Sequence, residues 1–321
     1  VAGRQRFKFL AQFLKIYYTP EEIVEIVRSY RKELLTRETA VPRENYRHAV
    51  DDLYYFQEAA SGALCREIFD LRMGVFINLE DYAQAEQEAE HFLAGPVKAE
   101  DQAGMAVAYK MQAEVHAAAG RYEEASRDVK QLLKRDHYQE ALAAAEIVLG
   151  KAPTLAEVWA SKGIAAGELG DHANALESFQ KATALRPEEA RYWRNQSWTL
   201  SRLDRNSEAL ASAERAVELQ PDDARAWERL GWAAGDLGDH AKALESFQKA
   251  AALEPEAASH WWHQAQALER VERYVEALAC AERAAKLQPG DASLLIRKAW
   301  VLSALGRTEE GLADLEEALK R

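Results

Sequence analysis

Apolar and polar positions repeat with the period of an α-helix along most of the chain. In residues 173–185, for example, apolar side chains recur at i, i+3, i+4 and i+7. Similar stripes predict helices over residues 4–18, 20–38, 42–61, 64–78, 82–93, 101–119, 121–133 and 138–149. Ala, Leu, Glu, Arg and Lys, which dominate the sequence, all favour helices. The pattern predicts an all-α fold.

A second, longer period lies over the carboxyl-terminal half of the chain. A tryptophan recurs every 34 residues, and a proline follows each one 28 residues later, at Trp159, Trp193, Trp227 and Trp261 and at Pro187, Pro221, Pro255 and Pro289. Small residues keep the same register, at Gly163, Ser197, Gly231, Ala265 and Ala299, and at Ala175, Ala209, Ala243, Ala277 and Gly311. We expect close backbone contacts at these points, with Phe179, Phe247 and Leu315 filling the space between them. Such regular spacing is typical of stacked copies of one unit.

These positions form the pattern W-x3-small-x11-A-x3-(F/A/L)-x2-A-x4-P, which resembles the tetratricopeptide repeat, a helix-turn-helix unit of this length. The resemblance covers four full copies beginning at residues 156, 190, 224 and 258, and a fifth from residue 292. It implies an α-α superhelix, a solenoid of antiparallel helix pairs. Turn residues are expected within each pair, at Gly170, Asp204, Gly238, Glu272 and Gly306.

The repeats also form a larger duplicated block. Residues 165–188 match residues 233–256 at all but four positions, so a pair of units 68 residues long has been copied. Duplication extends the surface and says nothing by itself about chemistry.

The amino-terminal part follows the repeat less closely. Two degenerate copies place Phe69, Phe76, Ala85, Ala89 and Phe92, and then Tyr109, Ala113, Ala125, Val129 and Leu132, at the repeat positions. The helix over residues 138–149 then comes too early for the register. The preceding helix serves two neighbours, the solenoid is interrupted, or two segments are joined. We divide the chain into a helical region with degenerate repeats, residues 1–135, and a regular array, residues 136–321.

The first 18 residues hold four basic and five aromatic side chains and no acid. A membrane-surface or partner-binding helix would have this composition. A capping helix is favoured, because the aromatic residues do not share one face.

Composition limits the classes of function. The net charge of −12 and the pI near 5.3 argue against a nucleic-acid partner, for which a basic footprint is expected. No apolar stretch reaches the roughly 18 residues that a membrane span needs, which predicts a soluble protein. The two cysteines are far apart in sequence and predict neither a disulfide nor a metal motif. The compartment stays open between cytoplasm and periplasm. Because the chain begins with Val and lacks a polar closing helix, we expect the natural protein to continue past Arg321.

Motifs of enzymes are absent from the sequence. It contains no GxxxxGK(S/T), GxGxxG, HExxH or GxSxG segment, and nothing pairs its carboxylates as acid and base. His260 and His263 could bind a metal from one helix face, but the nearest carboxylate in sequence is Glu269, so a surface or groove role is favoured. We expect no enzyme activity, cofactor or metal.

Surface residues are therefore the candidate functional residues. The resemblance implies that the first helix of each unit lines a groove with its second, fifth, ninth, twelfth and thirteenth residues. The groove residues expected on this basis are Arg191, Arg194, Trp198, Arg202, Arg225, Glu228, Trp232, Trp262, Gln266, Arg270, Ile296 and Trp300. Four tryptophans would then pack between units, while Trp198, Trp232, Trp262 and Trp300 would anchor a partner, as exposed Trp and Arg often do.

The leading hypothesis is a non-catalytic protein-protein interaction scaffold or adaptor. Its partner would be a protein or peptide segment with acidic and apolar side chains, bound in the concave groove. Two alternatives stay open: an export scaffold that contacts carbohydrate or another polymer, because tryptophan faces also stack on sugars, and the regulatory half of a larger enzyme or transcription factor.

Overall fold

The computed structural model describes residues 63–78, 80–94 and 102–319 and contains no strand within them. The chain forms two compact units, Val1–Ala165 and Ala166–Arg321, which are considered separately. The predicted helices over residues 4–18, 20–38 and 42–61, and the aromatic segment at the amino terminus, lie outside the described residues. None of the described helices is long and apolar enough to cross a membrane.

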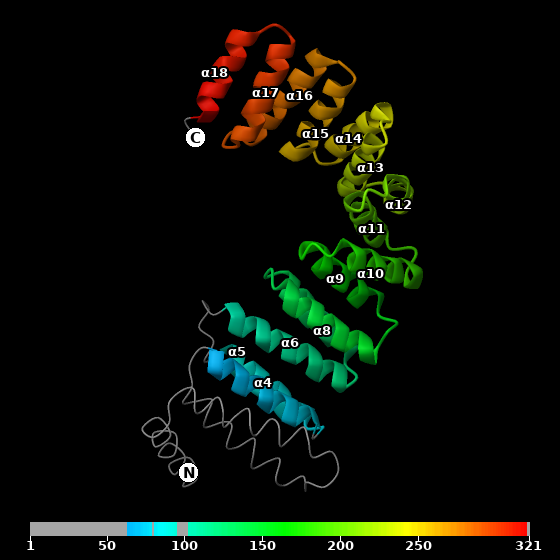
Figure 1. Cartoon of the computed structure of the whole chain (residues 1–321), viewed down its shortest axis with the longest axis vertical. Helices are drawn as coiled ribbons and strands as arrows, with labels where there is room; N and C mark the ends of the chain where they lie inside the picture. The colour runs from blue at the N-terminus through cyan, green and yellow to red at the C-terminus, as the bar shows by residue number, and fades with distance from the viewer. Residues whose placement is uncertain (1–62, 79, 95–101, 320–321) are drawn as a thin grey trace. The chain divides into compact units, whose positions relative to one another are not determined.

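The helices follow one another in pairs (Figure 1). In the first unit they are α4 (Ala63–Asn78), α5 (Tyr82–Ala94), α6 (Gln102–Ala118), α7 (Tyr122–Leu133) and α8 (Tyr138–Lys151), and α9 (Ala156–Glu168) runs across the boundary. The second unit contains α10 (His172–Leu185), α11 (Ala190–Arg202), α12 (Asn206–Leu219), α13 (Ala224–Asp236), α14 (His240–Leu253), α15 (Ala258–Arg270), α16 (Tyr274–Leu287), α17 (Ala292–Ala304) and α18 (Thr308–Leu319). The predicted all-α solenoid of antiparallel helix pairs is confirmed.

Each predicted turn inside a repeat contains one residue in the left-handed region. The φ angle is +83° at Gly170, +81° at Gly238 and +77° at Gly306, and it is +56° at Asp204 and +61° at Glu272. The backbone amide of the following residue then closes the helix end, as Asp171 N–H does by donating to the carbonyl of Ala166. Asp171 also caps the next helix by accepting a hydrogen bond from the amide of Asn174.

The recurring tryptophan and proline are joined by a hydrogen bond that the spacing alone did not predict. In each case the indole Nε1–H donates to the carbonyl oxygen of the proline six residues earlier, at 2.8 Å. We call these pairs the Trp–Pro clasps; they are Pro153–Trp159, Pro187–Trp193, Pro221–Trp227 and Pro255–Trp261. The four tryptophans are half-buried, so each clasp fixes the entry of a first helix as well as packing on its neighbours.

Packing of the small residues agrees with the repeat register. A Cβ atom added at Gly231 would lie 2.7 Å from the ring of Phe247, and one added at Gly311 would lie 2.9 Å from the carbonyl oxygen of Ala299. The backbones therefore approach as closely as expected. Phe179 and Phe247 are buried, whereas Leu315 is 36% exposed. The expectation that Leu315 fills space between helices is wrong, because its side chain lies on the open surface of α18.

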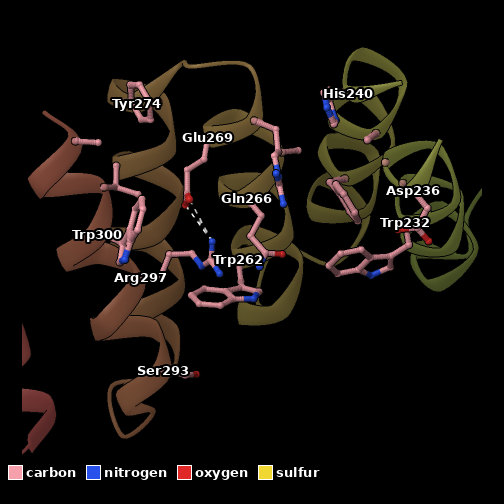
Figure 2. A pocket seen from close by; sticks show the side chains of 18 of the residues that line it. Trp232, Asp236, His240, Trp262, Gln266, Glu269, Tyr274, Ser293, Arg297 and Trp300 are labelled. Atoms are coloured by element: carbon pink, nitrogen blue, oxygen red, sulfur yellow. Dashed lines mark hydrogen bonds and ion pairs between the residues drawn. The ribbon is translucent and has the colours of Figure 1, made fainter. Parts of the chain in front are cut away.

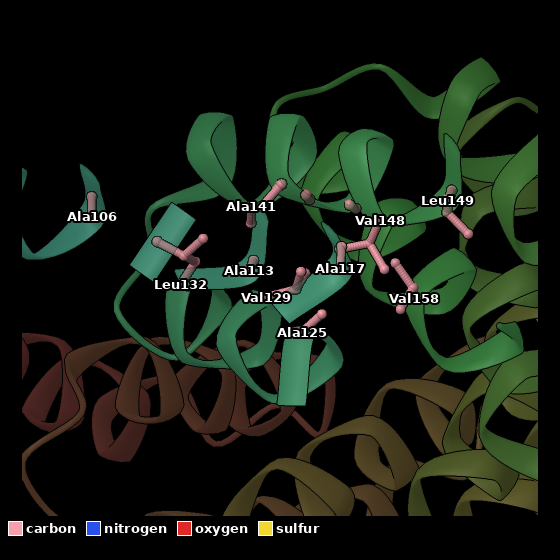
Figure 3. Packing of buried hydrophobic residues seen from close by; sticks show 13 residues of the cluster. Ala106, Ala113, Ala117, Ala125, Val129, Leu132, Ala141, Val148, Leu149 and Val158 are labelled. Atoms are coloured by element: carbon pink, nitrogen blue, oxygen red, sulfur yellow. The ribbon is translucent and has the colours of Figure 1, made fainter. Parts of the chain in front are cut away.

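Both degenerate copies of the first unit bury their repeat positions. Phe69, Phe76, Ala85, Ala89 and Phe92 belong to one buried cluster. Ala113, Ala125, Val129 and Leu132 belong to another, which continues through α8 to Val158 and Ala165 of α9 (Figure 3). Asp136, between α7 and α8, has a left-handed φ of +60°, like the turns inside the repeats. Helix α8 packs on both α6 and α7, so three helices share one core where the register breaks.

A polar network joins α5, α6 and α7 beside this core. His116 is buried, its Nδ1 lies 2.6 Å from Oδ2 of Asp128 and its Nε2 lies 3.3 Å from Oε1 of Glu86. Arg121 donates two hydrogen bonds to Glu86, at 3.0 and 2.9 Å. Although burial opposes the charged imidazole, the hydrogen bond and charge of Asp128 and the contact with Glu86 raise the pKa of His116.

Candidate functional site

The four tryptophans expected in the groove differ in their surroundings. Trp300 is 72% exposed on α17. Trp262 on α15 is half-buried and lies under the guanidinium of Arg297, 4.3 Å from its ring centroid. Trp232 on α13 is half-buried, with its ring 5.4 Å from that of Phe247 and 4.8 Å from that of His263. The expected exposure therefore applies to Trp300, and the other indoles also serve the packing.

Trp198 occupies a more enclosed place on α11. Its ring lies edge-on to His172 of α10 at 5.7 Å, and a Cβ atom added at Gly167 would meet it at 3.0 Å. The indole therefore fills the space beside the preceding helices as well as facing the surface. Substitution of Trp198 would disturb packing together with any binding.

Three of these tryptophans line one open pocket of about 960 Å³ in the second unit (Figure 2). Helices α13, α15 and α17 contribute most of its wall, and α14 and α16 contribute the rest. The expected groove residues that meet there are Trp232, Trp262, Gln266, Arg270, Ile296 and Trp300. The structure thus brings together residues that are up to 68 positions apart in sequence.

Charged and polar groups in the pocket are arranged around Trp262. Glu269 accepts hydrogen bonds from the guanidinium of Arg297, at 3.2 and 3.4 Å (Figure 2). Burial raises the pKa of Glu269, and the charge and hydrogen bond of Arg297 work against this shift. The pair holds the Arg297 guanidinium flat on the Trp262 indole, which presents a rigid surface of aromatic and cationic character.

A basic seam lies between α11 and α13. Arg194 forms an ion pair with Asp223 at 2.5 Å, and both side chains are largely buried. Arg229 lies close enough to Arg194 and Arg225 for their charges to act on it. Burial, followed by the charges of Arg194 and Arg225, lowers the pKa of Arg229, and Glu228 opposes the shift. We call Arg194, Arg225 and Arg229 the arginine seam.

The remaining expected groove residues do not join the pocket. Arg191 donates to Glu189 at 2.8 Å and to the hydroxyl of Tyr192 at 3.3 Å. Arg202 is exposed in the last turn of α11. Their positions at opposite ends of one helix separate them from the pocket wall.

Glu228 faces a pair of histidines on the next first helix. Its Oε2 lies 3.4 Å from Nδ1 of His260, and its Oε1 lies 3.9 Å from Nδ1 of His263. Burial lowers the pKa of His263 to about 4, so this imidazole is neutral at neutral pH. The interaction with Glu228 and then the contact with Glu254 raise the pKa of His260 in spite of its burial. We call Glu228, His260 and His263 the histidine seam.

Sequence reasoning missed the sixth position of each repeat. Arg229, His263 and Arg297 occupy this position in three successive copies, and all three lie on the face that carries the seams and the pocket. The signal was present in the sequence, because Arg229 and Arg297 are 68 residues apart and correspond across the duplicated block.

Comparison with known proteins places the chain in a family. A family model described as tetratricopeptide repeat matches residues 129–190, 160–224, 194–241 and 229–292, and a second model with the same description matches residues 292–321. No curated protein matches the chain.

Solved structures show the same fold. PilW, described as a widely conserved type IV pilus biogenesis factor, is 20% identical with a TM-score of 0.55, over 60% of this chain and 96% of that chain. PilF of Pseudomonas aeruginosa is 20% identical with a TM-score of 0.54, over 64% and 90%. TTC0263, a thermophilic repeat protein of Thermus thermophilus, is 26% identical with a TM-score of 0.47, over 55% and 96%. The repeat matches cover more than half of the sequence, and the chain belongs to the tetratricopeptide repeat family.

Proposed function

We propose that the chain is a non-catalytic scaffold that holds a segment of a protein partner against the first helices of its second unit. Stacked helical repeats offer extended surfaces of this kind to partners. The observation that carries the proposal is the open pocket in which Trp232, Trp262 and Trp300 meet.

The pocket has the features of a protein-binding anchor site. Trp300 and Ile296 are 72% and 47% exposed on adjacent turns of α17, which leaves a large apolar area in water. Beside them, Arg297 and Trp262 form a rigid stacked pair. Tryptophan and arginine are enriched among residues that contribute most to binding energy. An apolar side chain of the partner fits between these two surfaces.

The partner segment is proposed to be acidic as well as apolar. The arginine seam lies on the same series of first helices as the pocket, and Arg229 is partly buried among like charges. A carboxylate of the partner would relieve the repulsion between these guanidinium groups and could accept paired hydrogen bonds from one of them. An extended segment would reach from the pocket over α15 and α17 toward α13 and α11.

A peptide selection tests the proposal. Random peptides displayed on phage are selected on the full chain, and the affinity of an enriched peptide is measured by calorimetry. We expect peptides with acidic and apolar residues. The variant Trp300→Ala should bind at least about tenfold more weakly, since a central tryptophan contact contributes about 2 kcal/mol or more.

Val275→Ala provides the matched control, because Val275 on α16 is also 72% exposed and lies outside the pocket. This variant should bind like the wild type. Equal binding by Trp300→Ala, or selection of basic peptides, would refute the assignment. Saturable binding of oligosaccharides in place of peptides would support the polymer-contacting alternative and also refute it.

A further inference from the structure

The histidine seam brings three metal-ligating side chains to one point. His260 and His263 lie one turn apart on α15, and Glu228 approaches them from α13. One ligand atom from each residue lies within 4.8 Å of the other two. The carboxylate is 32 residues before the first histidine, so the sequence motif of two histidines lacked the third member that the fold supplies.

Two ring nitrogens of the seam are buried and unsatisfied. Within the described part of the chain, Nδ1 of His260 and Nδ1 of His263 accept or donate no hydrogen bond, and both approach Glu228. His260 is only 3% exposed. Buried polar atoms without a partner are costly and uncommon in native proteins. An ion between the two nitrogens and the carboxylate would satisfy both.

The other nitrogen of His260 is already held by a carboxylate. Nε2 lies 3.2 Å from Oε2 of Glu254, a contact in which the ring N–H donates and leaves the lone pair on Nδ1, toward Glu228. Histidines that bind metals usually donate their second nitrogen to a carboxylate in this way. The ring of His263 is in turn held against Trp232 and Phe247, at 4.8 and 5.5 Å.

The repeat itself provides an internal comparison. At the positions of Glu228, His260 and His263, the seam between α11 and α13 has Arg194, Ala226 and Arg229, and the seam between α15 and α17 has Trp262, Leu294 and Arg297. Neither substitute set contains a metal ligand. The histidine seam is therefore not required by the packing of the repeat.

We propose that Glu228, His260 and His263 bind a divalent transition-metal ion, with Zn²⁺ as the best match. Two imidazoles and a carboxylate suit Zn²⁺, whereas Ca²⁺ and Mg²⁺ prefer oxygen ligands alone. Tetrahedral ligands of zinc are about 3.3–3.5 Å apart. The 3.4 Å between His260 and Glu228 fits this value, and the 3.9 Å between His263 and Glu228 needs only a small movement.

The ion would connect α13 to α15 directly behind the pocket. His263 touches Trp232, which lines the pocket, so metal binding would fix one wall of the proposed peptide site. The charges of Arg229 and Arg297 act on His263 and oppose a further cation. The affinity should therefore be lower than that of a structural zinc site. A fourth coordination position would remain for water or for a donor from a partner.

Metal titration of the full chain tests this site without any peptide. Calorimetry with Zn²⁺, Co²⁺, Ca²⁺ and Mg²⁺ should give saturable binding of one Zn²⁺ or Co²⁺ per chain and none of Ca²⁺ or Mg²⁺. Glu228→Gln and His263→Gln should each lower Zn²⁺ affinity at least about tenfold. Co²⁺ bound there should also quench tryptophan fluorescence, because Trp232 contacts His263.

Two further variants make the result decisive. His91→Gln replaces an exposed histidine of the first unit and should bind Zn²⁺ like the wild type, whereas Glu254→Gln should weaken binding by loosening His260. Circular dichroism establishes that each variant folds. No saturable Zn²⁺ binding, or equal binding by folded Glu228→Gln and His263→Gln, would overturn the proposal. Because no peptide is present, this outcome leaves the proposed scaffold function unaffected.

Discussion

The arginine seam and the histidine seam use the same repeat position in opposite ways. The fifth residue of the copy is Arg194 in one and Glu228 in the next. Arg194 pairs with the Asp223 side chain at the start of α13, while Glu228 faces His260 and His263 on α15. The helices, turns and clasps around both are alike. A constant framework thus carries different chemistry at each junction between copies.

The largest effect is expected from filling the space between α13 and α14. Gly231→Leu would place side-chain atoms into the ring of Phe247, since even a Cβ atom would lie 2.7 Å from it. We expect the free energy of unfolding to fall by about 3 kcal/mol, as for other overpacked cores. Urea denaturation followed by circular dichroism measures this loss.

Gly235→Ala is the control on the same helix. Its added Cβ would meet Ala243 at an ordinary 3.8 Å, so the free energy of unfolding should stay equal or rise by about 0.5–1 kcal/mol. Similar losses in both variants would show that the helix rather than the close contact with Phe247 sets the stability.

The clasps test whether the framework is the same beside both seams. Trp193→Ala and Trp227→Ala each remove a half-buried indole and its 2.8 Å hydrogen bond to a proline carbonyl. Each should lower the free energy of unfolding by roughly 3 kcal/mol. Denaturation of both variants under one condition compares them, and a difference above about 1 kcal/mol would contradict a common framework.

The arginine seam should affect the rate of binding more than stability. Arg194→Ala breaks an ion pair whose side chains are 21% and 12% exposed, with a cost of about 1 kcal/mol. Association with a selected acidic peptide should slow at low salt, and the difference from the wild type should shrink as salt rises. Stopped-flow fluorescence measures these rates. A loss of rate that does not depend on salt would argue against electrostatic attraction.

A histidine in the first unit gives the smallest predicted effect. The pKa of His116 is raised above its ordinary value of 6.5, so its stabilising contact with Asp128 is complete below that pH and is lost as pH rises through the raised pKa. Wild-type melting temperatures should therefore fall from pH 6 to pH 8 by more than those of His116→Gln. An equal fall in both proteins would exclude His116 as the cause, and His91→Gln should behave like the wild type.

Periodicity was sufficient to predict the repeated framework. The 34-residue spacing located the helix pairs, and Gly170 and Asp204 marked turns whose left-handed backbone the structure confirms. The three-helix packing at α8 could not be predicted, because Asp136 carries no glycine signal for its turn. Nor could the Trp–Pro clasps, since spacing does not reveal where an indole N–H points.

The candidate site was predictable only in part. Repeat register indicated that Trp262 and Trp300 share a face, and both line the pocket. Their exposure was not predictable, because Arg297 from the next helix covers Trp262. Glu228 was predicted as a groove residue, but its contact with His260 depends on how α13 packs on α15. Contacts between copies arise from packing, which a one-dimensional pattern does not contain.

The indole N–H signals of the eight tryptophans provide the most direct test of the proposed binding face. In an ¹⁵N–¹H NMR titration with the selected peptide, the signals of Trp232, Trp262 and Trp300 should shift. Those of the clasp tryptophans Trp159, Trp193, Trp227 and Trp261, which are bonded to proline carbonyls, should stay in place. Shifts confined to the clasp tryptophans, or none at saturating peptide, would contradict the account.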